Sequence, residues 1–110
     1  MKNIIKVRIG LYPFEIRFLD REQMERSHGE RCVGYCWFKQ RAIDIIDDMD
    51  KISTELTIRH EIVHAILYTQ GRVQQKKFDL EEVCELIAWK LPEINDVVER
   101  VMEQRYEKEN

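Results

Sequence analysis

Apolar and polar residues alternate in two runs at the start of the chain, and this alternation predicts two β-strands. A period of two is typical of a strand with one buried face. Residues 10–13 separate the runs and contain Gly10 and Pro13, so the two strands are expected to form a hairpin. The apolar positions of the two runs are Ile5, Val7, Ile9, Phe14, Ile16 and Phe18.

Two further segments of β-type sequence follow at residues 33–38 and 42–46. The strongly polar residues 20–31 precede them and are expected to form a loop or one short solvated helix. His28 belongs to this polar segment, so its side chain is expected to be exposed. An acidic run is interpreted as a solvated turn, because it lacks the Gly and the terminal Glu of an EF-hand loop. Its members are Asp44, Asp47, Asp48 and Asp50.

The second half of the chain has helical periodicity. Residues 56–68 predict one continuous buried helix, capped by Ser53 or Thr54 and ended by Gly71. The polar, basic residues 72–77 then lead to a second helix, and a third is expected to start near Pro92. The stripes expected to face the core are Leu80, Val83, Cys84, Ile87, Ala88 and Leu91 in the second helix, and Ile94, Val97, Val98, Val101 and Met102 in the third.

These elements predict an α+β fold in which an N-terminal antiparallel sheet of about four strands precedes three helices. The chain has 110 residues, which is enough for one hydrophobic core and not for two, so residues 1–110 are expected to form a single domain.

The sequence His60-Glu61-Ile62-Val63-His64 lies inside the predicted buried helix. Residues four apart lie one turn apart on the same face, so both imidazoles can hold one metal ion. Zinc binds histidine nitrogen readily, and a catalytic zinc site keeps one position open for water. Glu61 can then take a proton from that water, as in the H-E-x-x-H motif of zinc peptidases. The alternative is that His60 and His64 are ordinary core residues that bond to nearby backbone.

The third metal ligand is less clear from the sequence, because His28 and the acidic residues of the second helix all qualify. On a helical wheel Glu81 borders the apolar stripe, Glu85 lies further round, and Glu82 points away from the core. Glu81 is therefore the expected ligand and Glu85 the second choice. The alternative for Glu81 is that an acid in the first turn only complements the helix dipole.

Charge and cysteine content narrow the class of protein further. The formal net charge is −3, which gives no basic field for binding nucleic acid. The three cysteines cannot all pair, and we find no signal peptide or membrane span, so a reduced, cytoplasmic protein is expected. Cys32 and Cys36 are expected to be small buried hydrophobic residues, because no second cysteine pair completes a structural zinc site.

The stretch from Thr57 to Tyr68, followed by the stretch from Glu81 to Ala88, resembles the ImmA/IrrE metallo-endopeptidases, especially their short phage and prophage members. The resemblance covers roughly residues 34 to 90. It implies a small zincin-like domain of the gluzincin type, in which Glu81 aligns with the third zinc ligand. Cys84, Glu85 and Ile87 depart from the second motif of the family, where Ala, Asn or Asp, and Phe are usual.

The resemblance also implies a reaction and a partner. Zinc held by His60, His64 and Glu81 would activate a water molecule, and Glu61 would act as general base in peptide hydrolysis. An extended protein or peptide substrate, such as a helix-turn-helix repressor, could add as a strand beside residues 33–38, where Tyr35, Trp37 and Phe38 either line the cleft or simply pack in the sheet. The oxyanion donor is left open among Tyr68, Tyr35, Tyr106 and His28.

Two other classes of function stay open at this level. One is a non-catalytic zinc-binding regulatory or interaction module of phage or prophage origin, in which Glu61 has no chemical role. The other is a helical interaction protein without metal. Neither expectation includes a membrane partner, and the oligomeric state does not follow from the sequence.

Overall fold

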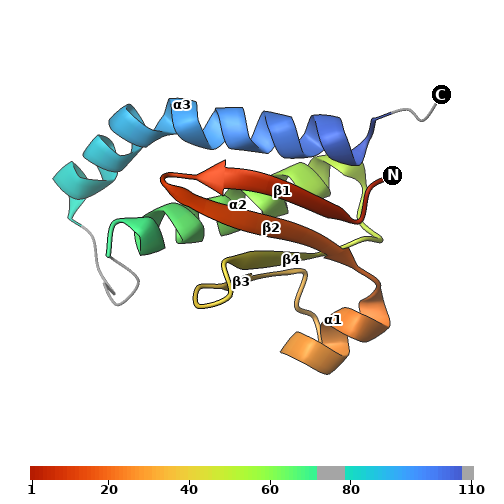
Figure 1. The fold of residues 1–110 in the computed structure, drawn as a ribbon. Coiled ribbons are helices and arrows are strands. Elements are labelled where there is room, and N and C mark those ends of the chain that lie inside the picture. The colour runs from red at the N-terminus through yellow and green to blue at the C-terminus, as the bar shows by residue number, and fades with distance from the viewer. Residues whose placement is uncertain (72–78, 108–110) are drawn as a thin grey trace.

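The structure is a computed structural model and describes residues 1–71 and 79–107. The fold is α+β, with a four-stranded sheet and α2 and α3 packed along one of its faces (Figure 1). The expected basic connection at residues 72–77 lies outside the described residues. The elements are β1 (Ile4–Ile9), β2 (Tyr12–Leu19), α1 (Arg21–His28), β3 (Gly34–Trp37), β4 (Ala42–Ile46), α2 (Lys51–Thr69) and α3 (Leu80–Arg105).

The sheet is mixed, so the expectation of an antiparallel sheet is wrong at one pairing. The order is β1-β2-β4-β3, and β4 runs parallel to β2 with Ile16 opposite Ile43. The predicted hairpin of β1 and β2 is confirmed, with Val7 opposite Phe14. β3 and β4 form the second antiparallel pair. β3 therefore lies at an edge of the sheet and β4 lies inside it.

The composition of β3 and β4 explains their order in the sheet. All five residues of β4 are buried, as a strand covered on both faces requires. β3 contains a glycine and an exposed Tyr35, which suits an edge. A meander with β3 beside β2 would leave the apolar strand at the edge, and the observed order avoids that exposure.

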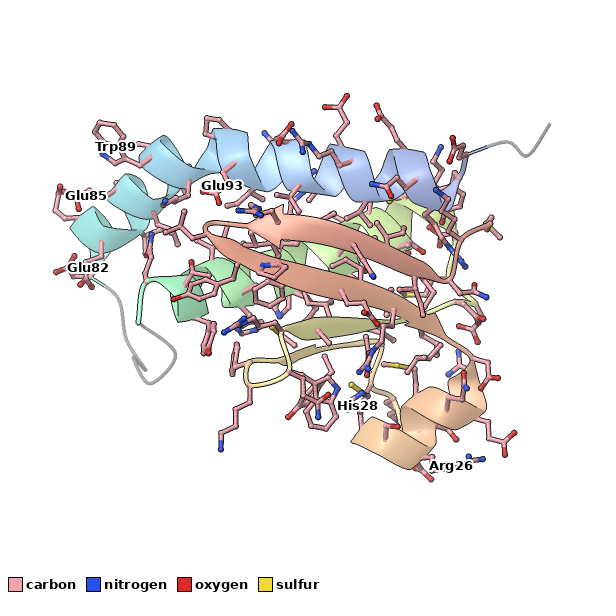
Figure 2. All side chains as sticks on the ribbon, viewed as in Figure 1. Arg26, His28, Glu82, Glu85, Trp89 and Glu93 are labelled. Carbon is pink, nitrogen blue, oxygen red and sulfur yellow. The ribbon has the colours of Figure 1, made fainter. Side chains whose placement is uncertain are left out.

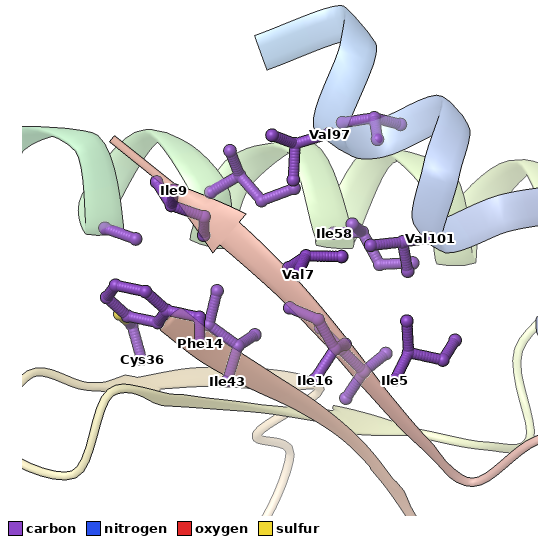
Figure 3. Packing of buried hydrophobic residues seen from close by; sticks show 14 of the residues in the cluster. Ile5, Val7, Ile9, Phe14, Ile16, Cys36, Ile43, Ile58, Val97 and Val101 are labelled. Atoms are coloured by element: carbon purple, nitrogen blue, oxygen red, sulfur yellow. The ribbon is translucent and has the colours of Figure 1, made fainter. Parts of the chain in front are cut away.

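The core lies between the sheet and the two long helices (Figure 3). Alternate residues of β1 and β2 point into it, as the period-two pattern predicted. The α2 residues Ile58 and Ile62 and the α3 residues Val97 and Val101 meet them there. These side chains are almost completely buried, so their packing fixes the position of α2 against the sheet.

α3 is one continuous helix, so the expected break near Pro92 is wrong. Pro92 has no N–H to donate to the carbonyl of Ala88, and such a position commonly bends a helix. Figure 1 shows α3 bending in its first part, which extends beyond the β1–β2 turn. The expected apolar stripe of this part does not reach the core, because Val83, Ile87 and Leu91 are exposed.

The start of α2 also differs from expectation. The cap is Asp50 and not Ser53 or Thr54: the backbone N–H of Ser53 donates to the Asp50 carboxylate at 2.7 Å. The hydrogen bonds from Ser53 lower the pKa of Asp50 by favouring its charged form, more than its slight desolvation raises it. α2 ends at Thr69, and Gly71 follows with a positive φ of 74°, as expected for a glycine that ends a helix.

The opposite face of the sheet carries α1 and a buried polar cluster. Of the two alternatives for residues 20–31, a loop or a short helix, the structure has the helix α1. His28 is not exposed as expected: its side chain is 1% accessible and its Nε2 lies 2.8 Å from Asp44 Oδ2. Asp44 also accepts hydrogen bonds from Arg17 at 2.6 Å and from Trp37 at 3.0 Å. Asp44 is therefore a buried residue of β4 and not part of a solvated turn.

The last turn of α3 is attached to the residues that precede β1. The guanidinium of Arg105 is buried and donates to the Lys2 carbonyl at 2.7 Å and to the Asn3 side chain at 2.9 Å. It also lies over the Phe18 ring, 4.1 Å from the ring centroid. The C-terminal half of α3 is thus held against β1 and β2 by polar contacts as well as by the core.

Candidate metal and catalytic site

The helical spacing of α2 presents His60 and His64 together on its surface. The neighbouring positions Ile58, Ile62 and Ala65 are buried, so the two histidines lie on the side of the helix that faces away from the core. Their Nε2 atoms are 3.2 Å apart, and the ring planes are inclined at 74°. Both rings therefore direct the same nitrogen toward one point.

This separation fits a shared zinc ion. Two nitrogen ligands about 2.0–2.1 Å from a tetrahedral zinc ion lie roughly 3.3–3.4 Å apart. The observed distance of 3.2 Å is close to that edge of the tetrahedron. A hydrogen bond between the rings has a similar length and needs one protonated Nε2, whereas a shared metal ion needs both nitrogens bare. The pair can adopt either state.

Glu61 lies behind the histidines, against the sheet. Its side chain is mostly buried, with 7% of the residue exposed, and Oε2 lies 4.0 Å from His60 Nε2. Burial raises the pKa of the Glu61 carboxyl, and the nearby His60 and His64 counteract only part of that rise. A carboxylate that favours its protonated form more than usual is well suited to accept a proton from water.

Gly34 is what allows Glu61 to approach β3. A Cβ at this position would lie 2.7 Å from Thr57 Cγ2 and 3.1 Å from Glu61 Oε2. Gly34 is not among the residues that the motifs predict for the site, although an isolated glycine inside a strand pattern often marks a close approach of the backbone.

Replacement of Gly34 by Ala is expected to destabilise the protein by about 1–3 kcal/mol, which is typical of an overpacked core. Thr57 cannot easily rotate away, because a β-branched side chain in a helix has few allowed rotamers. The free energy of unfolding, measured with urea, checks this expectation.

The matched control for this prediction is the double variant Gly34→Ala, Thr57→Ser. Serine lacks the Cγ2 methyl that meets the new Cβ, so the double variant should recover most of the lost stability. An unfolding free energy equal to that of the wild type in Gly34→Ala alone would contradict the close contact.

Two adjoining hollows flank the side chains of the motif. One, of about 310 Å³, is lined by Tyr35, Cys36, Phe38 and His64 together with Gly34, His60 and Glu61. The other, of about 430 Å³, is lined by Val33, Leu56 and Thr57 together with the same three residues. Gly34, His60 and Glu61 belong to both hollows, so the candidate site lies where they meet.

The aromatic residues and the candidate oxyanion donors lie in different parts of the structure. Tyr35 lines the first hollow, and Tyr68 stacks on Phe38 of that hollow with ring centroids 5.4 Å apart. The Tyr35 ring also stacks on His28, with ring centroids 4.4 Å apart, and Trp37 packs against both rings, so the two aromatic side chains of β3 lie on the face that carries His28. His28 is held there by Asp44, and Tyr106 lines a different hollow between α2 and α3. Tyr35 therefore borders the first hollow while its ring is held against His28, and the choice of oxyanion donor stays open.

Among the described residues, no third metal-binding side chain lies beside the histidine pair. Glu81 is exposed in the first turn of α3, and within residues 1–71 and 79–107 no three His, Cys, Asp or Glu side chains are grouped to hold a metal ion. Figure 2 shows the Glu82 and Glu85 side chains at the start of α3, directed away from the sheet. The role of Glu81 as the third metal ligand therefore stays a prediction.

The cysteines behave mainly as small apolar residues. Cys36 is buried in the core, and burial together with the nearby Glu61 carboxylate raises the pKa of its thiol to about 12. Cys32 is half-buried and Cys84 is exposed, so the expectation of burial holds fully only for Cys36.

Comparison of the chain with models of known protein families, with curated proteins and with solved structures gives no match. Among the described residues, no helix is both long enough and apolar enough to cross a membrane.

Proposed function

We propose that the protein is a zinc-dependent metallo-endopeptidase of the ImmA/IrrE type. The observation that carries the proposal is the arrangement of His60, Glu61 and His64: two Nε2 atoms 3.2 Å apart beside a buried carboxylate. The spacing suits one zinc ion held by the two imidazoles, and the carboxylate lies close to the pair and is left for proton transfer. This is the division of labour that metal-assisted hydrolysis needs.

The roles of the residues follow from that arrangement. A bound zinc ion supplies Lewis acidity, which acidifies a water molecule and polarises a carbonyl oxygen. His60 and His64 hold the metal through Nε2. Glu61 takes a proton from the water and later donates it to the amine that leaves the cleaved peptide bond. The donor of a hydrogen bond to the developing oxyanion stays open, because the Tyr35 ring stacks on His28.

A peptide substrate is supported by the position of β3. This strand lies at the edge of the sheet, and Gly34 and Cys36 border the hollow that contains Glu61. An extended peptide can pair with an open strand edge through its main chain, whatever its sequence. Small molecules and folded surfaces do not need such an edge.

The third ligand requires a movement of α3. We expect the first part of this helix to bend further at Pro92 and to bring Glu81 toward the histidine pair. Two observations support the bend: Pro92 lies inside the helix and has no N–H to donate, and the apolar residues Val83, Ile87 and Leu91 remain 38%, 52% and 42% exposed. Burial of these side chains against α2 would favour the closed arrangement.

Zinc stoichiometry tests the metal site and its ligands. After exposure to zinc and removal of loosely held ions, the wild type should retain one zinc ion per chain. Variants His60→Ala and His64→Ala should retain almost none. Glu81→Ala should fold and bind zinc at least tenfold more weakly, because three protein ligands become two.

The matched control is Glu85→Ala, which removes an acid one turn away in the same helix and should bind zinc like the wild type. Equal affinity in the Glu81→Ala variant and the wild type would exclude Glu81 as a ligand, and weaker binding by Glu85→Ala would assign the role to Glu85, the second choice from the sequence. Absence of zinc from the wild type would overturn the proposed function.

The physiological substrate is proposed from the resemblance alone. A helix-turn-helix repressor is the partner that the resemblance implies, and no basic surface is expected to bind DNA directly. Incubation of the zinc-loaded protein with the repressor encoded nearest to it, followed by mass spectrometry, tests the idea. A repressor that stays intact while unrelated peptides are cut would exclude that partner.

A further inference from the structure

The open edge of β3 presents specific backbone groups. The N–H of Ile46 donates to the Val33 carbonyl at 3.0 Å, which makes these two residues a hydrogen-bonded pair. Such pairs alternate along an antiparallel ladder, so the backbone groups of Tyr35 face β4 and those of Gly34 and Cys36 face outward. The Cys32 thiol donates to the outward Gly34 carbonyl at 3.2 Å, as this alternation predicts.

A row of apolar side chains leads to the site along α2. Ile52, Leu56, His60 and His64 are spaced four residues apart, and Ile52 and Leu56 are among the large hydrophobic residues that remain exposed. Leu56 is 61% exposed and lines the larger hollow beside Glu61. Apart from His60 and Glu61, the residues that line this hollow are uncharged: Val33, Gly34, Leu56 and Thr57.

We propose that this hollow selects an extended polypeptide segment with a large aliphatic residue beside the bond to be cut. The segment pairs with the outward backbone groups of Gly34 and Cys36, and every second side chain then points toward α2. The side chain next to Glu61 lies against Leu56 and Thr57. An acidic side chain there would lose its water of hydration without gaining a Lys or Arg partner, because the lining contains neither. The hydrolysis in this proposal rests on the proposed function, whereas the binding of the segment does not.

The test measures binding separately from hydrolysis. The protein is the zinc-loaded Glu61→Gln variant, and the probes are fluorescein-labelled octapeptides of Ala and Thr with one central Leu, Ser or Asp. Fluorescence anisotropy should show the Leu peptide bound about tenfold or more tightly than the other two, as expected for burial of an aliphatic side chain.

Two further variants locate the preference. Leu56→Asp, made in the Glu61→Gln protein, should abolish the advantage of the Leu peptide. Leu11→Asp is the matched control, because Leu11 is 85% exposed in the β1–β2 turn and away from the hollow, and it should leave the preference unchanged. Circular dichroism verifies that both variants are folded.

The outcomes separate the two proposals. Equal affinity for the three peptides, no measurable binding, or a preference that survives Leu56→Asp would overturn the selective hollow. A wild-type protein that binds the Leu peptide selectively but cuts no peptide would overturn the peptidase function and leave the binding site standing.

Discussion

Replacement of Glu61 by Gln should abolish hydrolysis while leaving the fold and zinc binding intact. General acid–base catalysis contributes roughly 10²- to 10⁴-fold, so the rate of peptide cleavage should fall by at least about two orders of magnitude. Gln occupies the same space as Glu but cannot take a proton from water. The expected loss is measured as the turnover of a peptide mixture by mass spectrometry, with zinc content determined on the same samples.

Stability gives this experiment a second readout. Glu61 is a mostly buried carboxyl whose ionised form is penalised by desolvation. A neutral Gln avoids that penalty, so the variant should be at least as stable as the wild type. Residues that serve chemistry at the expense of stability behave in this way. A Glu61→Gln protein that keeps full activity would instead favour the non-catalytic zinc module.

Removal of the Asp44 carboxylate should produce the largest loss of stability. Asp44 is buried and accepts hydrogen bonds from Arg17, His28 and Trp37, so Asp44→Ala leaves three donors without their acceptor. Breaking a buried charged pair typically costs about 3–5 kcal/mol. Because Arg17 is partly exposed, we expect a value near the lower end, about 3 kcal/mol. Urea unfolding at pH 7 measures it.

The same residue should govern sensitivity to acid. Burial alone would raise the pKa of Asp44, but the hydrogen bonds from Arg17, His28 and Trp37 and the Arg17 charge outweigh it and lower the pKa. The stabilisation is therefore present above the unfolded-state pKa of about 3.9 and is lost as the pH falls through the lower folded-state value. The unfolding free energy of the wild type should fall more steeply in this window than that of Asp44→Ala.

Asp48→Ala is the surface control for Asp44. Asp48 pairs with Arg21 at 2.9 Å, but both side chains are largely exposed, so its removal should cost less than about 1 kcal/mol. The Asp50 cap of α2 is retained in both variants and contributes equally to their acid response. A similar loss for Asp44→Ala and Asp48→Ala would contradict the buried cluster.

Local patterns predicted the elements well where periodicity decided them. The β1–β2 hairpin, both later strands, α1 and α2 lie where the sequence placed them. The expectation of an antiparallel sheet failed at the pairing of β2 with β4, which is parallel, because two antiparallel strand pairs can join in either orientation. The uninterrupted apolar run of β4, buried at every position, was the available signal for a central strand.

The errors at single residues have a common cause. His28 and Asp44 are each polar in a polar segment, and only the fold brings them together across the sheet and removes them from water. Pro92 suggested a helix start because proline is favoured there, but packing of the residues after it carries the helix through. For the site, spacing alone predicted the convergence of His60 and His64, whereas the close approach of β3 depends on a missing Cβ at Gly34.

The hydrogen bonds between Arg105 and the residues that precede β1 affect how the chain folds during synthesis. Asn3 and Lys2 lie 102 and 103 positions before Arg105, so distant parts of the chain must meet before these hydrogen bonds form. Ile5 and Val7 of β1 likewise await Val97 and Val101 to complete their core. A ribosome-bound chain can form the local β1–β2 hairpin early, and α2 can then cover part of its apolar face. The rest of that face stays uncovered until the end of α3 has left the exit tunnel, so the core closes only after this helix has emerged.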